Sequence, residues 1–196
     1  MKADALEPLL AEVRACRLCS AHLPLGPRPV VQASSRSRLL IVSQAPGRKV
    51  HDTGIPFNDA SGDRLRDWLG VDRATFYDAE RIAIVPMGFC FPGTGKGGDL
   101  PPRPECAPAW HPRLLPRLTQ VRLTLAIGQY AQAGLLEERR GRTLTDIVLA
   151  WRTHVARGVL PLPHPSPRNR LWLKRNPWFE AELLPELRRL VVDALH

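Results

Sequence analysis

The stretch GVLPLPHPSPRN, residues 158–169, indicates the fold and the place of a functional site. Its apolar first half predicts a buried strand over residues 159–162, and its second half holds His164 between two prolines. Proline fixes φ and disfavours a helix, so we expect the imidazole on a stiff loop at the end of that strand. Ligands of open parallel α/β sheets bind beyond the carboxyl ends of the strands, where His164 would stand. The alternative is a Pro-rich loop whose histidine faces solvent.

Three other apolar runs predict strands at residues 39–43, 81–85 and 121–127. Apolar spacing predicts helices at residues 4–15, 61–70, 107–118, 129–136, 143–151 and 177–195. We expect Ser61 to cap the second helix, Gly70 to end it, and Pro185 to bend the last one. Pro161 cannot donate to a strand ladder and therefore suits an edge strand.

Strands that alternate with helices imply crossover connections and a mainly parallel sheet that is covered on both faces. The sequence therefore predicts a single domain over residues 1–196, a three-layer α/β/α sandwich around a four-stranded, mainly parallel sheet. Residues 48–60 are predicted to form a long loop, and long loops in compact domains tend to be functional.

The chain is basic, with 28 Lys and Arg against 19 Asp and Glu, and a formal charge of +9. Such an excess favours a polyanionic partner, because phosphate contacts release condensed counterions; the alternative is a basic surface without a partner. No apolar segment approaches the roughly 18 residues of a membrane span, and the N-terminus lacks a signal-peptide pattern. We therefore expect a cytoplasmic, monomeric protein without a membrane partner.

Four cysteines form two pairs, Cys16-x2-Cys19 and Cys90-x15-Cys106. In a cytoplasmic protein such cysteines favour metal ligation over disulfides. Zinc takes four thiolates tetrahedrally, and an iron–sulfur cluster also takes four, so the spacing does not choose between them. The remaining alternative is four unrelated buried thiols.

Five motifs follow one another in an informative order over residues 16–169. They are CRLC (16–19), SQAPG (43–47), TGIPFNDASG (53–62), the C-x15-C pair (90–106) and HPS (164–166). In this order they resemble the iron–sulfur members of the uracil-DNA glycosylase superfamily, the family 4 and family 5 types. The resemblance implies a DNA repair enzyme that hydrolyses the N-glycosidic bond of uracil or a related deaminated base in DNA and leaves an abasic site. It also implies a structural 4Fe–4S cluster on Cys16, Cys19, Cys90 and Cys106, with zinc as the alternative.

The same resemblance assigns roles in base binding. Phe57 is similar to the phenylalanine that stacks on the extruded base, although ordinary core packing is the alternative. Gln44 and Ala45 lie in the motif whose backbone approaches the base and the attacking water, and the small Ala45 and Gly47 permit that approach. His164 corresponds to the histidine that donates a hydrogen bond to the departing base, where negative charge develops.

The sequence departs from the family pattern at two points. The acid that many members carry in or after the SQAPG motif is missing; the nearest acids are Asp52 and Asp59, and Asp52 or His51 could position water. Pro86 stands where family 4 has an asparagine for the amide edge of the base. These departures leave open a hypoxanthine or xanthine glycosylase and a catalytically weak or inactive DNA-binding relative. An unrelated alternative is a zinc-containing hydrolase of small molecules.

A basic segment follows the histidine and is predicted to contact DNA phosphates or the minor groove. Its candidate contacts are Ser166, Arg168, Asn169, Arg170 and Lys174. Arg168 stands where some relatives place an apolar wedge, and the alternative is a solvated helix start. A second basic group, Arg139, Arg140 and Arg142, is expected to be solvated, and Trp172 and Trp178 are expected in the core.

Overall fold

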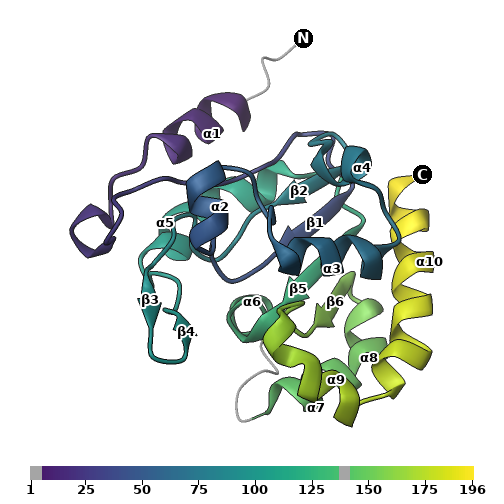
Figure 1. Ribbon diagram of the computed structural model, residues 1–196. Coiled ribbons are helices and arrows are strands. Elements are labelled where there is room, and N and C mark those ends of the chain that lie inside the picture. The colour runs from purple at the N-terminus through teal and green to yellow at the C-terminus, as the bar shows by residue number, and fades with distance from the viewer. Residues whose placement is uncertain (1–5, 137–141) are drawn as a thin grey trace.

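A four-stranded parallel sheet in the order β2-β1-β5-β6 forms the centre of the computed structural model (Figure 1). Its strands are β1 (Leu39–Val42), β2 (Ile82–Ile84), β5 (Leu123–Ile127) and β6 (Val159–Leu162). The structure describes residues 6–136 and 142–196. Every neighbouring pair in this sheet is parallel, which confirms the predicted α/β class and all four predicted strands. Within these residues no helix has the length and apolar content needed to cross a bilayer.

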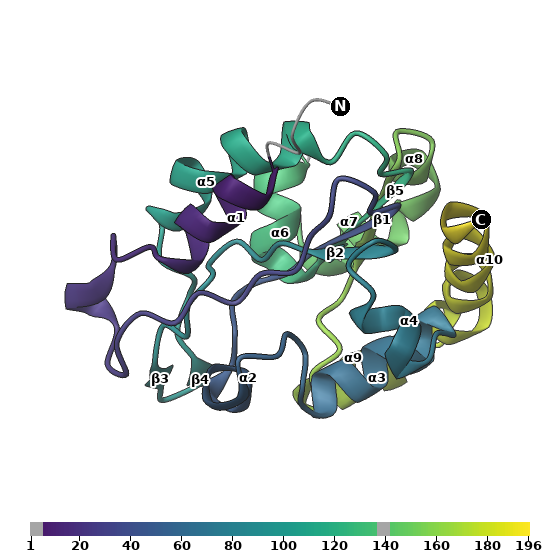
Figure 2. The same ribbon diagram turned by 90° about the horizontal axis from the view of Figure 1, so that it is seen from above.

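Helices cover both faces of the sheet (Figure 2). They are α1 (Leu6–Arg14), α2 (Arg48–Thr53), α3 (Ala60–Leu69), α4 (Arg73–Tyr77), α5 (Cys106–Leu114), α6 (Gly128–Leu135), α7 (Leu144–Leu149), α8 (Trp151–Val155), α9 (Arg170–Arg175) and α10 (Leu184–Leu195). Side chains of β1 alternate between two cores: Leu39 and Ile41 join one cluster, whereas Leu40 and Val42 join the other. This two-sided burial explains why the strands are continuous apolar runs.

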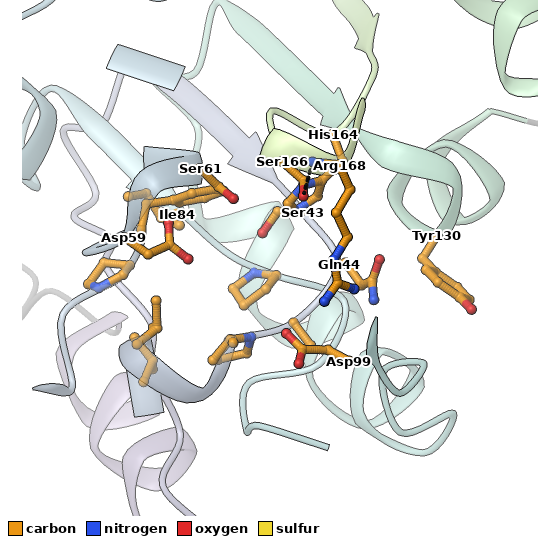
Figure 3. Close-up of a pocket in the computed structure, with 18 of the residues that line it drawn as sticks. Ser43, Gln44, Asp59, Ser61, Ile84, Asp99, Tyr130, His164, Ser166 and Arg168 are labelled. Atoms are coloured by element: carbon orange, nitrogen blue, oxygen red, sulfur yellow. Dashed lines mark hydrogen bonds between the residues drawn. The ribbon is translucent and has the colours of Figure 1, made fainter. Parts of the chain in front are cut away.

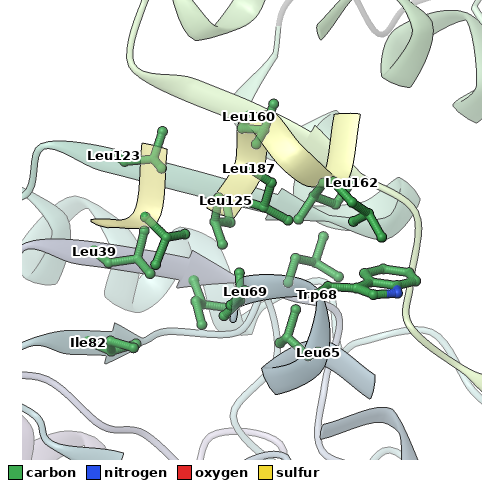
Figure 4. Packing of buried hydrophobic residues seen from close by; sticks show 14 of the residues in the cluster. Leu39, Leu65, Trp68, Leu69, Ile82, Leu123, Leu125, Leu160, Leu162 and Leu187 are labelled. Carbon is green, nitrogen blue, oxygen red and sulfur yellow. The ribbon is translucent and has the colours of Figure 1, made fainter. Parts of the chain in front are cut away.

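The two cores use different helices. The larger one packs the sheet against α3 and α10, and Figure 4 shows Leu65, Trp68 and Leu69 of α3 facing the strand leucines. The other packs the sheet against α1, α5 and α6. Trp172 and Trp178 are partly buried against the larger core, as predicted.

The segment between β1 and β2 differs from the prediction. Residues 48–60 contain α2, a six-residue helix between Gly47 and Gly54, which is too short to show a clear apolar period. The N-cap of α3 is Asp59, whose side chain accepts a hydrogen bond from the Gly62 amide at 2.9 Å, and not Ser61. Gly70 ends α3 in a left-handed conformation, as predicted.

The C-terminal helix is irregular near Pro185, where a bend was predicted. A π-helical turn, Phe179–Leu183, leads directly into α10, and Pro185 lies in the first turn of α10. Proline has no N–H to donate to the carbonyl four residues earlier, so a regular α-helix cannot continue through this point. The helix predicted over residues 143–151 is likewise divided, into α7 and α8.

Both edges of the sheet are covered or interrupted. At the β6 edge, Pro161 pairs with Ala126 of β5 and carries no amide hydrogen for the outer side. At the β2 edge, Gln32 and Ile84 exchange two backbone hydrogen bonds of 3.1 and 2.7 Å. The Gln32 side chain also donates to the Ile82 carbonyl at 2.8 Å.

The Gly/Pro-rich excursion between Cys90 and Cys106 forms a small antiparallel hairpin of β3 (Thr94–Gly95) and β4 (Gly98–Asp99). The hairpin projects from the sheet and lies beside α2 in both views (Figures 1 and 2). It brings a segment that is distant in sequence to the carboxyl end of β1.

Candidate active site

A cavity of about 560 Å³ lies at the carboxyl ends of β1 and β6. Gln44 follows β1, Phe57 lies between α2 and α3, and His164 follows β6. All three side chains line this cavity, although they come from three separate segments. Figure 3 shows the polar residues around it.

His164 is held by its own loop. The Asn169 side-chain amide donates to the His164 carbonyl at 2.6 Å, which fixes the backbone. Gly128 has a positive φ of 79°, and a Cβ atom at this position would lie 3.5 Å from the His164 Cβ. Burial lowers the pKa of His164 below its ordinary 6.5, while the Asp59 carboxylate acts in the opposite direction. The imidazole is therefore neutral at pH 7 and can donate one hydrogen bond.

Phe57 is held in an unusual backbone conformation. Its φ is +53°, and among the described residues no other non-glycine has a positive φ. The residue is 8% exposed, and its ring packs edge-on against Phe76, with 6.1 Å between the ring centroids. Such backbone strain costs of order 1–3 kcal/mol and persists where the surroundings enforce it.

The surroundings of Phe57 supply that constraint. The buried Arg66 guanidinium donates to the Phe57 carbonyl at 3.5 Å, and the Tyr77 hydroxyl donates to it at 3.4 Å. Arg66 also contacts Tyr77 at 3.2 Å and Asp63 at 2.5 Å. Sequence reasoning missed Arg66 and Tyr77, because nothing in their local pattern relates them to a carbonyl on another segment.

Two carboxylates lie beside Gly47, in the SQAPG motif, where the sequence lacks the acid that many superfamily members carry. A Cβ atom on Gly47 would lie 3.1 Å from the Asp99 Oδ2 and 3.9 Å from the Asp59 Oδ2. Both acids line the cavity, and Figure 3 shows their carboxylates turned toward the space between them. Asp59 is one of the two nearby acids noted in the sequence, whereas Asp99 lies on the distant hairpin and no local motif marks it.

His51 and Asp52 do not line the cavity. Both lie on α2, where the His51 ring is buried near Phe91, with 6.1 Å between the ring centroids. Asp52 pairs with Arg48 at 3.0 Å on the surface. Of the four residues, only Asp59 and Asp99 line the cavity. His51 and Asp52 were expected on a loop, but they lie on α2, and this helix turns them away from the cavity lining.

The predicted DNA-contacting residues fall into two groups. Ser166, Arg168 and Asn169 line the cavity, whereas Arg170 and Lys174 lie on α9 outside it. The Ser166 hydroxyl accepts a hydrogen bond from the Arg168 amide at 3.2 Å and so caps the following turn. Arg142 is exposed, and Arg139 and Arg140 lie outside the described residues.

Arg168 joins the histidine loop to the hairpin. Its Nη1 donates to the Gly97 carbonyl at 3.0 Å. A Cβ atom on Gly98 would lie only 1.8 Å from that Nη1. The guanidinium therefore occupies the space that a side chain at position 98 would need. The side chain runs toward Gln44 and Asp99 in Figure 3. In the described structure Arg168 thus forms part of the cavity wall.

Pro86, which we expected at the position of a family 4 asparagine, is a buried part of the cavity wall. Its carbonyl accepts a hydrogen bond from the His111 Nε2 at 3.0 Å and is therefore turned toward α5. Burial lowers the pKa of His111, and the bond to Pro86 opposes this effect. Pro86 has no N–H or amide side chain, so it contributes an apolar ring to the cavity wall.

All four cysteines, free of disulfides, line a second, smaller cavity of about 20 Å³. Burial raises the pKa of the Cys106 thiol to about 12, although the Phe89 amide donates to its sulfur at 3.3 Å. Within residues 6–136 and 142–196, no group of three or more His, Cys, Asp or Glu is already arranged to hold a metal ion. The donor set nevertheless fits a soft metal centre, because four thiols from both cysteine pairs surround one space.

Fold and cavity together define an α/β protein with a ligand site at the carboxyl ends of parallel strands, where a neutral imidazole, an aromatic ring and two carboxylates meet. Residues 31–188 match the family described as the Uracil DNA glycosylase superfamily. The chain belongs to this superfamily. Membership supports a DNA glycosylase hydrolase of base excision repair in general. The matched region contains every residue named above as lining the larger cavity, and it begins after Cys16 and Cys19.

Proposed function

We propose that the protein is a monofunctional glycosylase that hydrolyses the N-glycosidic bond of uracil or a related deaminated base in DNA and leaves an abasic site. The observation that carries the proposal is the meeting of His164, Phe57 and Gln44 in one cavity. Its volume of about 560 Å³ lies within the roughly 300–1,000 Å³ typical of ligand sites. A base extruded from the duplex would enter there.

Each of the three residues has a distinct task in the proposed reaction. The Phe57 ring stacks on the base, and the Gln44 segment approaches its polar edge. Cleavage leaves negative charge on the departing base, and a fixed donor at its carbonyl oxygen lowers the barrier. His164 supplies this donor as a neutral imidazole, because burial lowers its pKa.

Asp59 is the residue that we propose to orient the attacking water. Its Oδ1 accepts the Gly62 amide at 2.9 Å, which fixes the carboxylate and leaves Oδ2 available. A carboxylate here also stabilises the positive charge that develops on the sugar.

We further propose that Cys16, Cys19, Cys90 and Cys106 hold a 4Fe–4S cluster, with zinc as the alternative. The support is their convergence on one small cavity. When bound, the cluster would join the segment after α1 to the excursion that carries the hairpin. The cluster would stabilise the fold and would take no part in base release.

The test uses single- and double-stranded oligonucleotides that contain uracil, hypoxanthine or xanthine, followed by alkaline cleavage of abasic sites. Release of a deaminated base, and its loss in His164→Ala, would support the proposal. The control is His196→Ala, because His196 is exposed at the C-terminus and outside the cavity. Binding without product would indicate an inactive DNA-binding relative.

Pro86 removes a reason to restrict the substrate to uracil. An asparagine amide could both donate to and accept from uracil, whereas the buried Pro86 surface does neither. Hypoxanthine and xanthine therefore stay open as substrates beside uracil, and product from only one of the three oligonucleotides would identify the base.

A further inference from the structure

We propose, on the basis of the glycosylase function above, that Arg66 is a positioning residue for base binding. Its guanidinium holds the Phe57 carbonyl and thereby keeps the Phe57 ring in the cavity wall, where the ring would stack on an extruded base. Arg66 does not line the cavity itself, so it would act on the base only through Phe57.

The first support is that Arg66 interrupts the apolar side of α3. It is 6% exposed and is buried on this helix together with Leu65, Trp68 and Leu69. An arginine stays charged in a protein, and a buried charge is costly unless it is paired and hydrogen-bonded. Its ion-pair partner, Asp63, has a side chain that is 75% exposed. An apolar residue would therefore serve the fold about as well, and the buried cation indicates a functional task.

The second support is what the guanidinium contacts. The Arg66 Nη1 lies 3.5 Å from the Phe57 carbonyl oxygen and 3.2 Å from the Tyr77 hydroxyl, and that hydroxyl is 3.4 Å from the same carbonyl. In the described part of the chain both donors to this carbonyl are side chains. The guanidinium carbon also lies 5.3 Å from the ring centroid of Phe76, against which the Phe57 ring packs. Arg66 thus supports both the backbone of Phe57 and the ring behind it.

The third support is the backbone conformation that these donors stabilise. With a φ of +53°, the Phe57 carbonyl points at the first turn of α3 while the side chain lines the cavity. A bulky residue rarely adopts a positive φ, and such strain persists only where the surroundings enforce it. Without the Arg66 donor, the backbone would relax toward a negative φ and the ring would leave its place in the wall. The buried cation therefore fixes an aromatic surface before DNA binds.

The experiment separates binding of the base from binding of the rest of the DNA. It measures dissociation constants of duplexes that carry non-cleavable 2′-fluoroarabino analogues of the uracil, hypoxanthine or xanthine nucleotides. It also measures the constant of the same duplex with a tetrahydrofuran abasic analogue. The base contribution is defined as the abasic dissociation constant divided by that of the base-containing duplex. Urea unfolding measures the stability of every variant in parallel.

Arg66→Met keeps an unbranched apolar side chain over Phe76 and removes the donor. We expect it to lower the base contribution by about 5-fold or more, with a urea midpoint close to that of the wild type because the exposed Asp63 stays solvated. Phe57→Ala should lower the base contribution by about 10-fold, the effect of losing one base–aromatic stack. In the Phe57→Ala background, Arg66→Met should have no further effect, because its route to the base is already removed.

Three further variants control the test. Arg73→Ala is the matched control: Arg73 is exposed, lies 5.0 Å from the Tyr77 ring centroid and donates to Asn58 instead of to the Phe57 carbonyl. It should leave the base contribution unchanged. Arg66→Lys keeps a cation and a donor, so it should retain more of the base contribution than Arg66→Met. Tyr77→Phe removes the second donor and should also lower the base contribution, so it carries the test if Arg66→Met does not fold.

An unchanged base contribution in the folded Arg66 and Tyr77 variants would overturn the role of Arg66 while leaving the glycosylase proposal intact. Equal losses of affinity for the base-containing and abasic duplexes would overturn it as well, because a merely structural role predicts that result. An unchanged base contribution in Phe57→Ala would remove both Phe57 and Arg66 from base binding. A wild-type protein that neither releases nor preferentially binds any of the three bases would overturn the glycosylase proposal, and the role of Arg66 with it.

Discussion

The carbonyl oxygen of Phe57 lies 1.7 Å from the position that a Cβ atom on Gly62 would occupy. Gly62 lies in the first turn of α3, and its amide is bound by Asp59. The absence of a side chain at residue 62 thus lets the helix pass directly beneath the strained Phe57. The same helical turn consequently positions both the ring that we propose to stack on the base and the carboxylate that we propose to orient the water.

Gly62→Ala should therefore destabilise the protein, although alanine normally favours a helix over glycine. The added methyl group meets the Phe57 backbone, and overpacking of this kind costs about 1–3 kcal/mol. Gly97→Ala is the matched control, because a Cβ atom there has no neighbour within 4 Å. Urea unfolding of both variants measures the difference, and equal midpoints would contradict the contact between Phe57 and Gly62.

His164→Ala should lower the single-turnover rate of base release by about 10²–10³, the effect typical for loss of one donor to a developing anion. Circular dichroism should show an unchanged fold, since the Asn169 bond is to the His164 backbone and remains possible. Full activity in this variant would remove His164 from the mechanism.

Thermal stability should fall as the pH is lowered from 7.5 to 5.5. Burial lowers the pKa values of His51, His111 and His164 below 6.5 in the folded state. Below pH 6.5 the unfolded chain therefore binds more protons than the folded protein, and the stability that these neutral histidines contribute above that pH is lost. His111→Gln, which can still donate to the Pro86 carbonyl, should show a smaller loss in melting temperature; an equal loss would argue against a neutral His111.

Anaerobically purified protein should contain about four iron atoms per chain and be coloured. Cys106→Ser should lose the metal and melt at a lower temperature, because the linked segments would separate more easily. Metal analysis also tests the alternative, since a colourless protein with one zinc ion would identify a zinc site. A wild-type protein that contains no metal and melts at the same temperature as Cys106→Ser would contradict both the cluster and the zinc site.

DNA affinity should fall steeply with salt if α9 contacts phosphates. Each phosphate contact contributes about −0.9 to the slope of log K against log salt for duplex DNA. Lys174→Ala should therefore make this slope less negative by about 0.9. Arg36→Ala is the control, because Arg36 precedes β1 at the opposite end of the sheet and pairs with Glu80. Identical slopes for Lys174→Ala and the wild type would exclude this contact.

The strands could be predicted because local patterns mark them, whereas Phe57 and Gln44 were singled out by the resemblance to the superfamily. Each strand is an apolar run, and parallel strands bring the residues that follow them to one edge. Asp99 could not be predicted, since its place depends on a hairpin far along the chain and on an arginine from the histidine loop. His51 and Asp52 were misplaced because a short helix between two glycines has little apolar signal. Aspartate is a favoured N-cap residue, so Asp59 could have been predicted as the start of α3, but Ser61, which is also a favoured N-cap type, was chosen instead.

The treatment of the two sheet edges has a consequence for behaviour in concentrated solution. An unprotected outer strand offers a row of donors and acceptors to strands of other molecules. Here Gln32 already occupies partners on β2, and Pro161 removes a donor from β6. Edge-to-edge strand pairing between molecules is therefore obstructed at both edges of the sheet. The central strands can be almost wholly apolar without offering an open edge for fibril growth.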